Sequence, residues 1–219
     1  MQEVLNFLSA LKENNNKDWF DQNRDRYQEC RKKIFFLTEM IIQEVGKFDS
    51  EIGAQHPKDC VFRIFRDVRF SNDKTPYKTN MGSFIAKGGR KSVTAGYYLH
   101  IEPGASFVGG GSYCPPADAL KAFRTEIFDH PDDFKKLIHD ESFLKVYPTM
   151  YDDQLKTAPK GFPKDFRDID LLKYKSFAFT SGLDDSVVTS EAFVEKVVAS
   201  MKTLYPANRF LNSALDKWL

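Results

Sequence analysis

The sequence has little cysteine, and its three cysteines lie far apart. Cys30, Cys60 and Cys114 are the only ones in 219 residues, and none belongs to a CxxC pair. An odd number of widely spaced thiols does not suit a disulfide framework, so we expect free, mostly buried thiols in a reducing compartment and a cytoplasmic location. The four histidines show no metal-ligand spacing among themselves or with the cysteines, and we therefore expect no metal site.

Long apolar runs and an excess of one charge are also missing. No stretch approaches the roughly 18 apolar residues that cross a membrane, and the N-terminal segment has no basic stretch ahead of an apolar run, so we expect neither a membrane span nor a signal peptide. The chain carries 32 Lys and Arg against 31 Asp and Glu, a net charge of +1. A general nucleic-acid binder usually has a strong basic excess, so nucleic acid is an alternative partner that the composition does not favour.

The apolar residues that are present follow a helical period near the N-terminus. Their spacing predicts a short helix over residues 2–12. Asn16 then suits an N-cap position, and a long amphipathic helix is predicted over roughly 17–47.

The period changes near residue 60. Phe62, Ile64, Val68 and Phe70 alternate with other residues and predict a strand over 61–70. Gly88-Gly89 predicts the turn of a hairpin, and Pro103-Gly104 predicts a second turn ahead of the short strand "ASFV".

Helical spacing returns after Pro115-Pro116, and a further helix is predicted to start near Pro131. The stretch "KSFAFTSGL" predicts one more strand. The C-terminal residues are predicted to be helical, with Pro206 as the first residue of a second helical segment.

These elements predict a single α+β domain over residues 1–219. N-terminal helices occupy about 2–48, a sheet about 60–108, and a helical and loop region about 115–219. The sheet is expected to be an antiparallel meander of about four to five strands, flanked by the N-terminal and C-terminal helices, because strands cluster between blocks of helices rather than alternating with them.

Charge is concentrated in "FRIFRDVRFSNDKTPYKTN", residues 62–80. This stretch holds five basic residues and two acidic ones, whereas the whole chain is only +1. Arginine presents forked donors and lysine a point charge, the usual means of holding phosphate or carboxylate. We therefore predict an anion-binding site whose ligand-binding residues are Arg63, Arg66, Arg69, Asp73, Lys74 and Lys78, with Asp67 orienting the arginines.

Two other interpretations of this stretch remain. Arg66 falls in the apolar register of the predicted strand, where a salt bridge with Asp67 or another carboxylate would be purely structural. A charged loop is also commonly a solvated surface, which accounts well for Lys74 and Lys78.

A second candidate lies in "GYYLHIE". Alternation places Tyr98, His100 and Glu102 on one face of a strand, where Glu102 can orient the imidazole of His100 for acid–base work. Tyr77 and Asp67 are further candidate catalytic residues. The alternative is a hydrogen-bonded histidine on a half-exposed sheet face, without a catalytic role. If this strand lies near 61–70, the two polar faces coincide.

Two glycine-containing segments give weaker signals. Gly110, in "SFVGGGSYCPP", allows close approach of a ligand to the backbone ahead of a helix N-terminus, and a strained turn explains it equally well. Lys160, in "LKTAPKGF", is a candidate ligand-binding cation in a loop.

Four stretches together resemble one known family. "NNNKDWFDQNRDRY", "FRDVRFSNDKTPYKTN", "GYYLHIEPGASFVGGGSY" and "LKTAPKGF" occur in this order and are similar to the domain-of-unknown-function family DUF 2461. The resemblance covers nearly the whole chain. It implies a soluble, single-domain α+β protein and supplies no activity, cofactor or catalytic residue.

The residues thus favour an enzyme or binding protein for an anionic small molecule, phosphorylated ligands included. The alternatives are a nucleic-acid-associated protein and a non-catalytic interaction or scaffold protein. The reaction, the cofactor and the oligomeric state are not assigned by the sequence.

Overall fold

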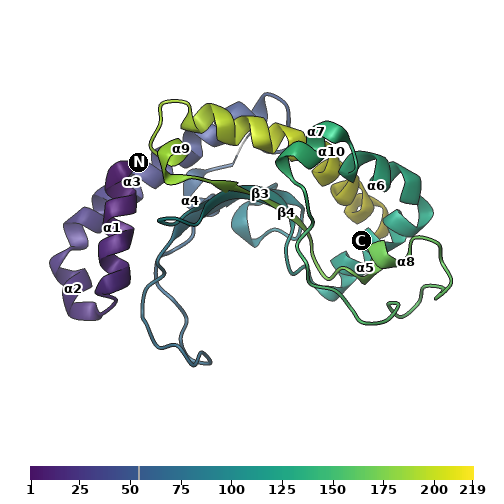
Figure 1. Cartoon of the computed structure of the whole chain (residues 1–219), viewed down its shortest axis with the longest axis horizontal. Coiled ribbons are helices and arrows are strands. Elements are labelled where there is room, and N and C mark those ends of the chain that lie inside the picture. The colour runs from purple at the N-terminus through teal and green to yellow at the C-terminus, as the bar shows by residue number, and fades with distance from the viewer. Residues whose placement is uncertain (54) are drawn as a thin grey trace.

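Four antiparallel strands form the centre of the structure, a computed structural model that describes residues 1–53 and 55–219 (Figure 1). They run in the spatial order β1 (Met81–Ile85), β2 (Gly96–Ile101), β3 (Ser106–Ser112) and β4 (Phe177–Leu183). Helices at both ends of the chain flank this sheet, which confirms the predicted α+β class. The fourth strand comes from "KSFAFTSGL", far along the chain from the other three.

The N-terminal part forms α1 (Gln2–Glu13), α2 (Lys17–Gln22) and α3 (Arg24–Gly46), followed by the short α4 (Pro57–Cys60). Asn16 caps α2 as predicted, since its side chain accepts a hydrogen bond from the Trp19 backbone N–H at 2.9 Å. The prediction of a single helix over 17–47 is wrong, because the helix is interrupted at Asn23, between α2 and α3. The Asn23 side chain donates to the Trp19 carbonyl at 2.9 Å and so competes with regular helical hydrogen bonding.

The C-terminal part is mostly helical. It contains α5 (Ala117–Asp129), α6 (Pro131–Ile138), α7 (Glu141–Val146), α8 (Ile169–Lys173), α9 (Asp185–Val188) and α10 (Phe193–Trp218). Pro206 lies inside α10 and does not begin a separate helix, which corrects the prediction. The carbonyl that Pro206 leaves without its helical partner belongs to the exposed Lys202, where water can hydrogen-bond to it.

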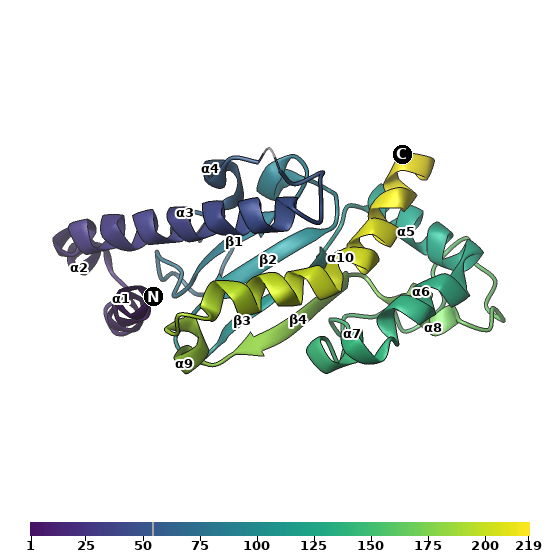
Figure 2. The ribbon, with the colours of Figure 1, turned by 90° about the horizontal axis from the view of Figure 1, so that it is seen from above.

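The two faces of the sheet have different neighbours. Seen from above, α3 and α10 lie across one face (Figure 2), and Tyr97, Leu99 and Ile101 of β2 are buried against that side. Strand register and alternation place Phe84, Tyr98, His100, Phe107 and Thr180 on the opposite face. We call this opposite face the lower face, after its position in Figure 1.

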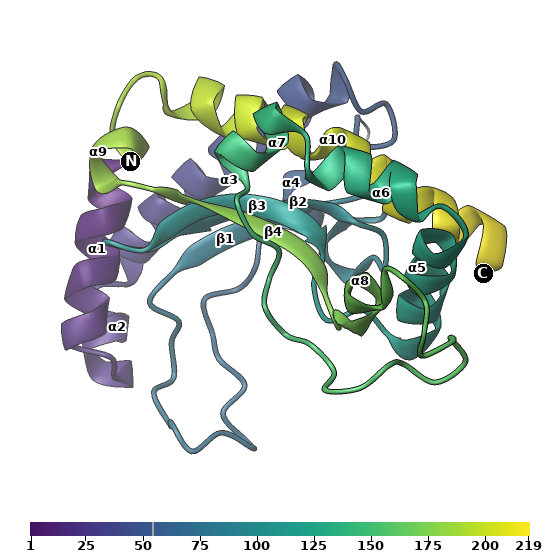
Figure 3. The ribbon, with the colours of Figure 1, turned by 45° about the vertical axis from the view of Figure 1, so that its right-hand side comes forward.

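The strand predicted over 61–70 is not formed. Residues 62–80, here called the arm, extend away from the sheet as a long loop (Figures 1 and 3). Only isolated bridges join its two sides, Val61 to Ser83 and Phe65 to Tyr77. Between the two bridges the chain advances by four residues on one side, from 61 to 65, and by six on the other, from 77 to 83. Regular strand pairing cannot continue across this mismatch.

None of the helices in residues 1–53 and 55–219 combines the length and the apolar character that crossing a membrane requires.

Candidate functional site

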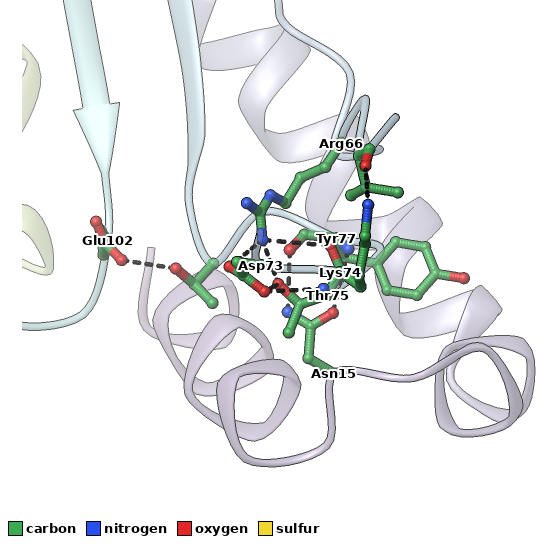
Figure 4. A network of polar contacts seen from close by, with 9 residues as sticks. Asn15, Arg66, Asp73, Lys74, Thr75, Tyr77 and Glu102 are labelled. Atoms are coloured by element: carbon green, nitrogen blue, oxygen red, sulfur yellow. Dashed lines mark hydrogen bonds and ion pairs between the residues drawn. The ribbon is translucent and has the colours of Figure 1, made fainter. Parts of the chain in front are cut away.

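The charged residues of the arm are largely paired with one another. The Arg66 guanidinium contacts the Asp73 carboxylate and the Thr75 hydroxyl (Figure 4). Arg69 donates to the Asp67 carboxylate through Nε at 2.9 Å and Nη2 at 2.7 Å. These contacts neutralise both arginines within the arm itself.

The pKa values of the two arm carboxyls reflect this pairing. The backbone N–H of Thr75, followed by the guanidinium of Arg66, lowers the pKa of Asp73 to about 2. Hydrogen bonds from Arg69 likewise hold the pKa of Asp67 below its ordinary value. Lys74 donates to the Val68 carbonyl at 3.0 Å, inside the same loop.

A cavity of about 600 Å³ opens instead on the lower face of the sheet. Its volume lies in the range of roughly 300–1,000 Å³ that is typical of small-molecule sites. Rings from the sheet and the surrounding loops dominate its lining, together with polar groups from the η1 segment (Gly89–Lys91) and the turn after β3. The lining includes Phe62, Phe84, Arg90, Ser92, Val93, Thr94, Tyr98, His100, Phe107, Gly110, Tyr113, Cys114, Tyr151 and Thr180.

A chain of polar side chains begins at the lining residues Tyr98 and His100 and continues to Glu102 and Thr79, which do not line the cavity. The Tyr98 hydroxyl is 3.0 Å from His100 Nδ1, and His100 Nε2 is 3.0 Å from Glu102 Oε2. The other carboxylate oxygen of Glu102 accepts a hydrogen bond from the Thr79 hydroxyl at 2.8 Å (Figure 4). The face predicted to carry Tyr98, His100 and Glu102 therefore forms one connected polar chain.

Packing holds the imidazole of His100 in place. The ring of Phe107, its cross-strand partner on β3, stacks on it at 4.6 Å with an interplanar angle of 15°. The side chains of His100 and Glu102 are only 12% and 23% exposed. Burial by itself would raise the pKa of Glu102, yet the hydrogen bonds from His100 and Thr79 hold this pKa below its ordinary value.

Arg63, Lys78 and Arg90 differ from the paired arginines Arg66 and Arg69. Within the described part of the chain, Arg63, Lys78 and Arg90 have no carboxylate within 4.0 Å. Arg90 lines the cavity and donates only to the Lys58 carbonyl, at 2.7 Å. The ammonium of Lys78 lies 5.2 Å from the ring centre of Phe62, which also lines the cavity.

Burial and a neighbouring charge act together on Lys78. Burial is the larger cause that lowers the pKa of its ammonium, and the nearby guanidinium of Arg63 lowers this pKa further. Two cations at close range disfavour each other's charged form unless an anion lies between them. The pair therefore marks a place where a negative group would be stabilised.

Gly110 has a structural role besides lining the cavity. A Cβ atom at this position would lie 2.1 Å from the Gly96 carbonyl oxygen and 2.6 Å from Leu204 Cδ2 of α10. The missing side chain thus lets β3 approach both β2 and α10. Gly110 lies within strand β3 and not in the strained turn that was the alternative interpretation.

The rim of the cavity contains residues that the sequence did not single out. Tyr113 and Tyr151 meet edge to face at 5.2 Å, and contacts with Tyr151 and Cys114 raise the pKa of Tyr113 to about 12. Cys114 has a φ of 47°, the one left-handed non-glycine residue in the described chain. The "SYCPP" turn after the glycines was the available signal, since prolines there make a sharp change of direction.

The remaining predicted residues lie elsewhere. Tyr77 stacks on Phe20 at 3.9 Å and is buried at the base of the arm. Lys160 is exposed in the loop between α7 and α8. His100 and Gly110 therefore line the cavity, and Glu102 is hydrogen-bonded to His100. Lys78 lies beside the lining residue Phe62, and Arg63 acts on Lys78. The other predicted arm residues, Arg66, Asp67, Arg69, Asp73 and Lys74, make their contacts within the arm.

Comparison with known proteins identifies the family of this chain. The family model described as "Conserved hypothetical protein (DUF2461)" matches residues 3–210. No curated protein and no solved structure matches the chain.

Proposed function

We propose that this chain, which belongs to the DUF2461 family of conserved hypothetical proteins, binds an anionic small molecule in the cavity on the lower face of its sheet. The observation that carries the proposal is that Arg90, a cation without a carboxylate partner in the described chain, lines an aromatic cavity. Arg90 contacts the anionic group, and Lys78, which lies 5.2 Å from the ring centre of the lining residue Phe62, adds positive charge together with Arg63.

Arg66 and Arg69 of the arm are less suited to binding an anionic ligand. An anion that approached Arg66 or Arg69 would compete with Asp73 or Asp67, whose carboxylates already occupy the guanidinium donors. Arg90, in contrast, uses one nitrogen for the Lys58 carbonyl and keeps donors free for a forked contact with phosphate or carboxylate. We assign Asp67 and Asp73 to the internal order of the arm.

The cavity lining defines the rest of the ligand. Phe62, Phe84 and Phe107 present rings toward the bound molecule, and rings favour a planar or apolar body that can stack on them. The ligand class is therefore an amphipathic molecule with one anionic group and a ring or chain of apolar character.

A nucleic acid suits this site less well than a small molecule. The net charge of the chain is +1, whereas backbone recognition draws on many cations and weakens steeply as salt rises. Free thiols support a reducing, cytoplasmic setting: Cys30 and Cys60 are buried, and burial raises the pKa of each to about 11.

The proposal can be tested with a matched pair of dyes. Anilinonaphthalene sulfonate is aromatic and anionic, and phenylnaphthylamine is its neutral counterpart. Fluorescence titration should show that Arg90→Gln and Lys78→Gln each weaken sulfonate binding by about tenfold, equivalent to ~1.4 kcal/mol, and leave binding of the neutral dye unchanged. Arg69→Gln is the matched control, since Arg69 is already paired with Asp67.

Three results would contradict the proposal. One is equal loss of both dyes in Arg90→Gln, a second is an equal effect of Arg69→Gln, and the third is a steep salt dependence with displacement by an oligonucleotide. Near-ultraviolet circular dichroism of each variant shows whether its fold is intact, so that dye binding to a loosened core is recognised.

A further inference from the structure

Each hydrogen bond in the polar chain from Thr79 to Tyr98 can be assigned a donor and an acceptor. Thr79 donates to one oxygen of Glu102, and the other oxygen faces His100 Nε2. Glu102 is ionised at neutral pH because these hydrogen bonds lower the pKa of its carboxyl. An ionised carboxylate can only accept, so Nε2 of His100 must carry a proton.

The tautomer of His100 then determines what Tyr98 does. A neutral imidazole with its proton on Nε2 has a lone pair on Nδ1. In this neutral form of the ring, the Tyr98 hydroxyl, 3.0 Å from Nδ1, donates to His100. This leaves the lone pairs of the Tyr98 oxygen without a partner in the described chain, on a residue that lines the cavity.

We propose that Tyr98 is the proton acceptor of this cavity, with His100 as its base and with Glu102 and Thr79 as positioning residues, so that the site transfers protons to and from its anionic ligand. The inference deepens the proposed function and rests on it. It places the reaction in the class of proton abstraction from an acidic O–H or C–H bond, and it needs no co-reactant.

The step balances without any other group. The ligand's X–H bond breaks and its proton passes to the Tyr98 oxygen, while the proton of Tyr98 passes to Nδ1 of His100. The products are the ligand anion, a neutral Tyr98 and an imidazolium that Glu102 stabilises. Return of the proton to the same or another ligand atom restores the starting state.

The groups around Tyr98 favour transfer of its proton to His100 over permanent ionisation of the Tyr98 hydroxyl. Burial, with the charge of Glu102 as a smaller cause, raises the pKa of Tyr98 to about 12, so the phenol stays protonated at neutral pH and has a proton to pass to His100 when it accepts one from the ligand. Around His100, Phe107 stacks on the ring, and Lys12 of α1 is a further cation that acts on Glu102. Arg90 stands on the cavity wall, where it can stabilise the negative charge that develops on the ligand.

A purely structural histidine would form its hydrogen bonds away from a cavity. Here the two ring nitrogens of His100 contact Tyr98 and Glu102, and both His100 and Tyr98 line the cavity. A structural role and a proton-transfer role for His100 predict different results in two measurements.

The first measurement uses a naphthol that carries a sulfonate on its other ring, because its O–H ionisation is visible by absorbance. Bound to the unmodified protein, the probe should ionise about one pH unit lower than in solution, a tenfold change in its ionisation constant. Tyr98→Phe and His100→Gln should return this value to that of the free probe while the dissociation constant changes by less than about threefold.

The outcomes separate the two proposals. Failure of the probe to bind, or binding that does not depend on Arg90, contradicts the anion site and the proton transfer that rests on it. Binding that depends on Arg90 but leaves the O–H ionisation unshifted, or equally shifted in Tyr98→Phe, overturns the proton transfer alone.

The second measurement needs no ligand. Nitrogen-15 NMR of the imidazole should show the proton on Nε2 and an unprotonated Nδ1, and the Nδ1 resonance should move in Tyr98→Phe because its hydrogen bond is lost. A proton on Nδ1, or an Nδ1 resonance that Tyr98→Phe leaves in place, overturns the relay. Tyr113→Phe is the control, since Tyr113 lies on the rim and should leave both His100 resonances unchanged.

Discussion

The arm and the lower face of the sheet use charge in opposite ways. In the arm, Arg66 and Arg69 lie beside Asp73 and Asp67, acids that are close in sequence. Arg90 and Lys78 have no such partner in the described chain, although Lys78 belongs to the same densely charged stretch. A high density of charge in a sequence therefore does not by itself locate a ligand site, which depends on the charges that the fold leaves without a partner.

Solvent exposure reinforces this contrast. The Arg69 and Asp67 side chains are 76% and 46% exposed, and exposed ion pairs of this kind contribute little to stability. His100, at 12% exposure, lies where an unsatisfied polar atom would be costly. Substitutions should therefore have large effects on stability at the sheet and small effects among the exposed charged residues of the arm.

The largest effect is expected at the glycine that lets β3 approach its neighbours. Gly110→Ala should destabilise the fold by at least about 3 kcal/mol, because the added Cβ meets a backbone oxygen at 2.1 Å. Urea unfolding would measure this change. Gly182→Ala on β4 is the control, since no atom lies within 4 Å of its added Cβ, and a similar loss there would contradict the packing argument.

A smaller effect is expected at the base of the arm. Asn15 donates to the Tyr77 carbonyl at 2.9 Å and accepts from the Tyr77 N–H at 3.1 Å. Asn15→Ala removes both bonds and should cost about 2 kcal/mol in the free energy of unfolding. Asn6→Ala, which loses one exposed side-chain bond to Gln2, should cost less than about 0.5 kcal/mol. Equal costs would show that the base of the arm does not anchor it.

The hydrogen bond from Tyr98 to His100 should have a modest effect on stability. Tyr98→Phe should lower the free energy of unfolding by about 1 kcal/mol, because one partly buried hydrogen bond is lost and His100 Nδ1 loses its donor. Tyr113→Phe is the control, because its side chain is 65% exposed at the rim, and should change stability by less than about 0.5 kcal/mol. A larger effect of Tyr113→Phe would reverse the proposed ranking of floor and rim.

The smallest effect is expected for the arm carboxyl Asp73, and it should depend on pH. Its pKa falls from 3.8 unfolded to about 2 in the fold, so the ionised form stabilises the native state above pH 3.8, and this contribution is lost as pH falls through about 2. The melting temperature of Asp73→Asn should lie slightly below that of the unmodified protein at neutral pH, and the difference should vanish in acid. A difference that persists at the lowest pH would show that the carboxylate charge is not its cause.

Local patterns predicted much of the fold. The α1 helix, the cap at Asn16, the β1–β2 hairpin and strand β4 follow from spacing, capping and turn residues, which act over a few positions. The strand predicted over 61–70 was wrong because alternation in the sequence does not ensure burial: of the alternating residues, Ile64 is buried, whereas Phe62 and Phe70 are exposed. Phe65 packs against Phe20 of α2 and Tyr77 at 5.8 and 5.5 Å and joins Tyr77 only by an isolated bridge.

The candidate site divides in the same way. The sequence by itself placed Tyr98, His100 and Glu102 on one face, because strand alternation is a local property of the backbone, and it located the charges of residues 62–80. Only the tertiary structure decided which cations meet a carboxylate, which face of the sheet holds a cavity, and that Arg90, Tyr113 and Cys114 surround it. Cavity formation depends on distances between residues far apart in the chain, such as Phe62, Arg90 and Thr180, and no local pattern encodes those distances.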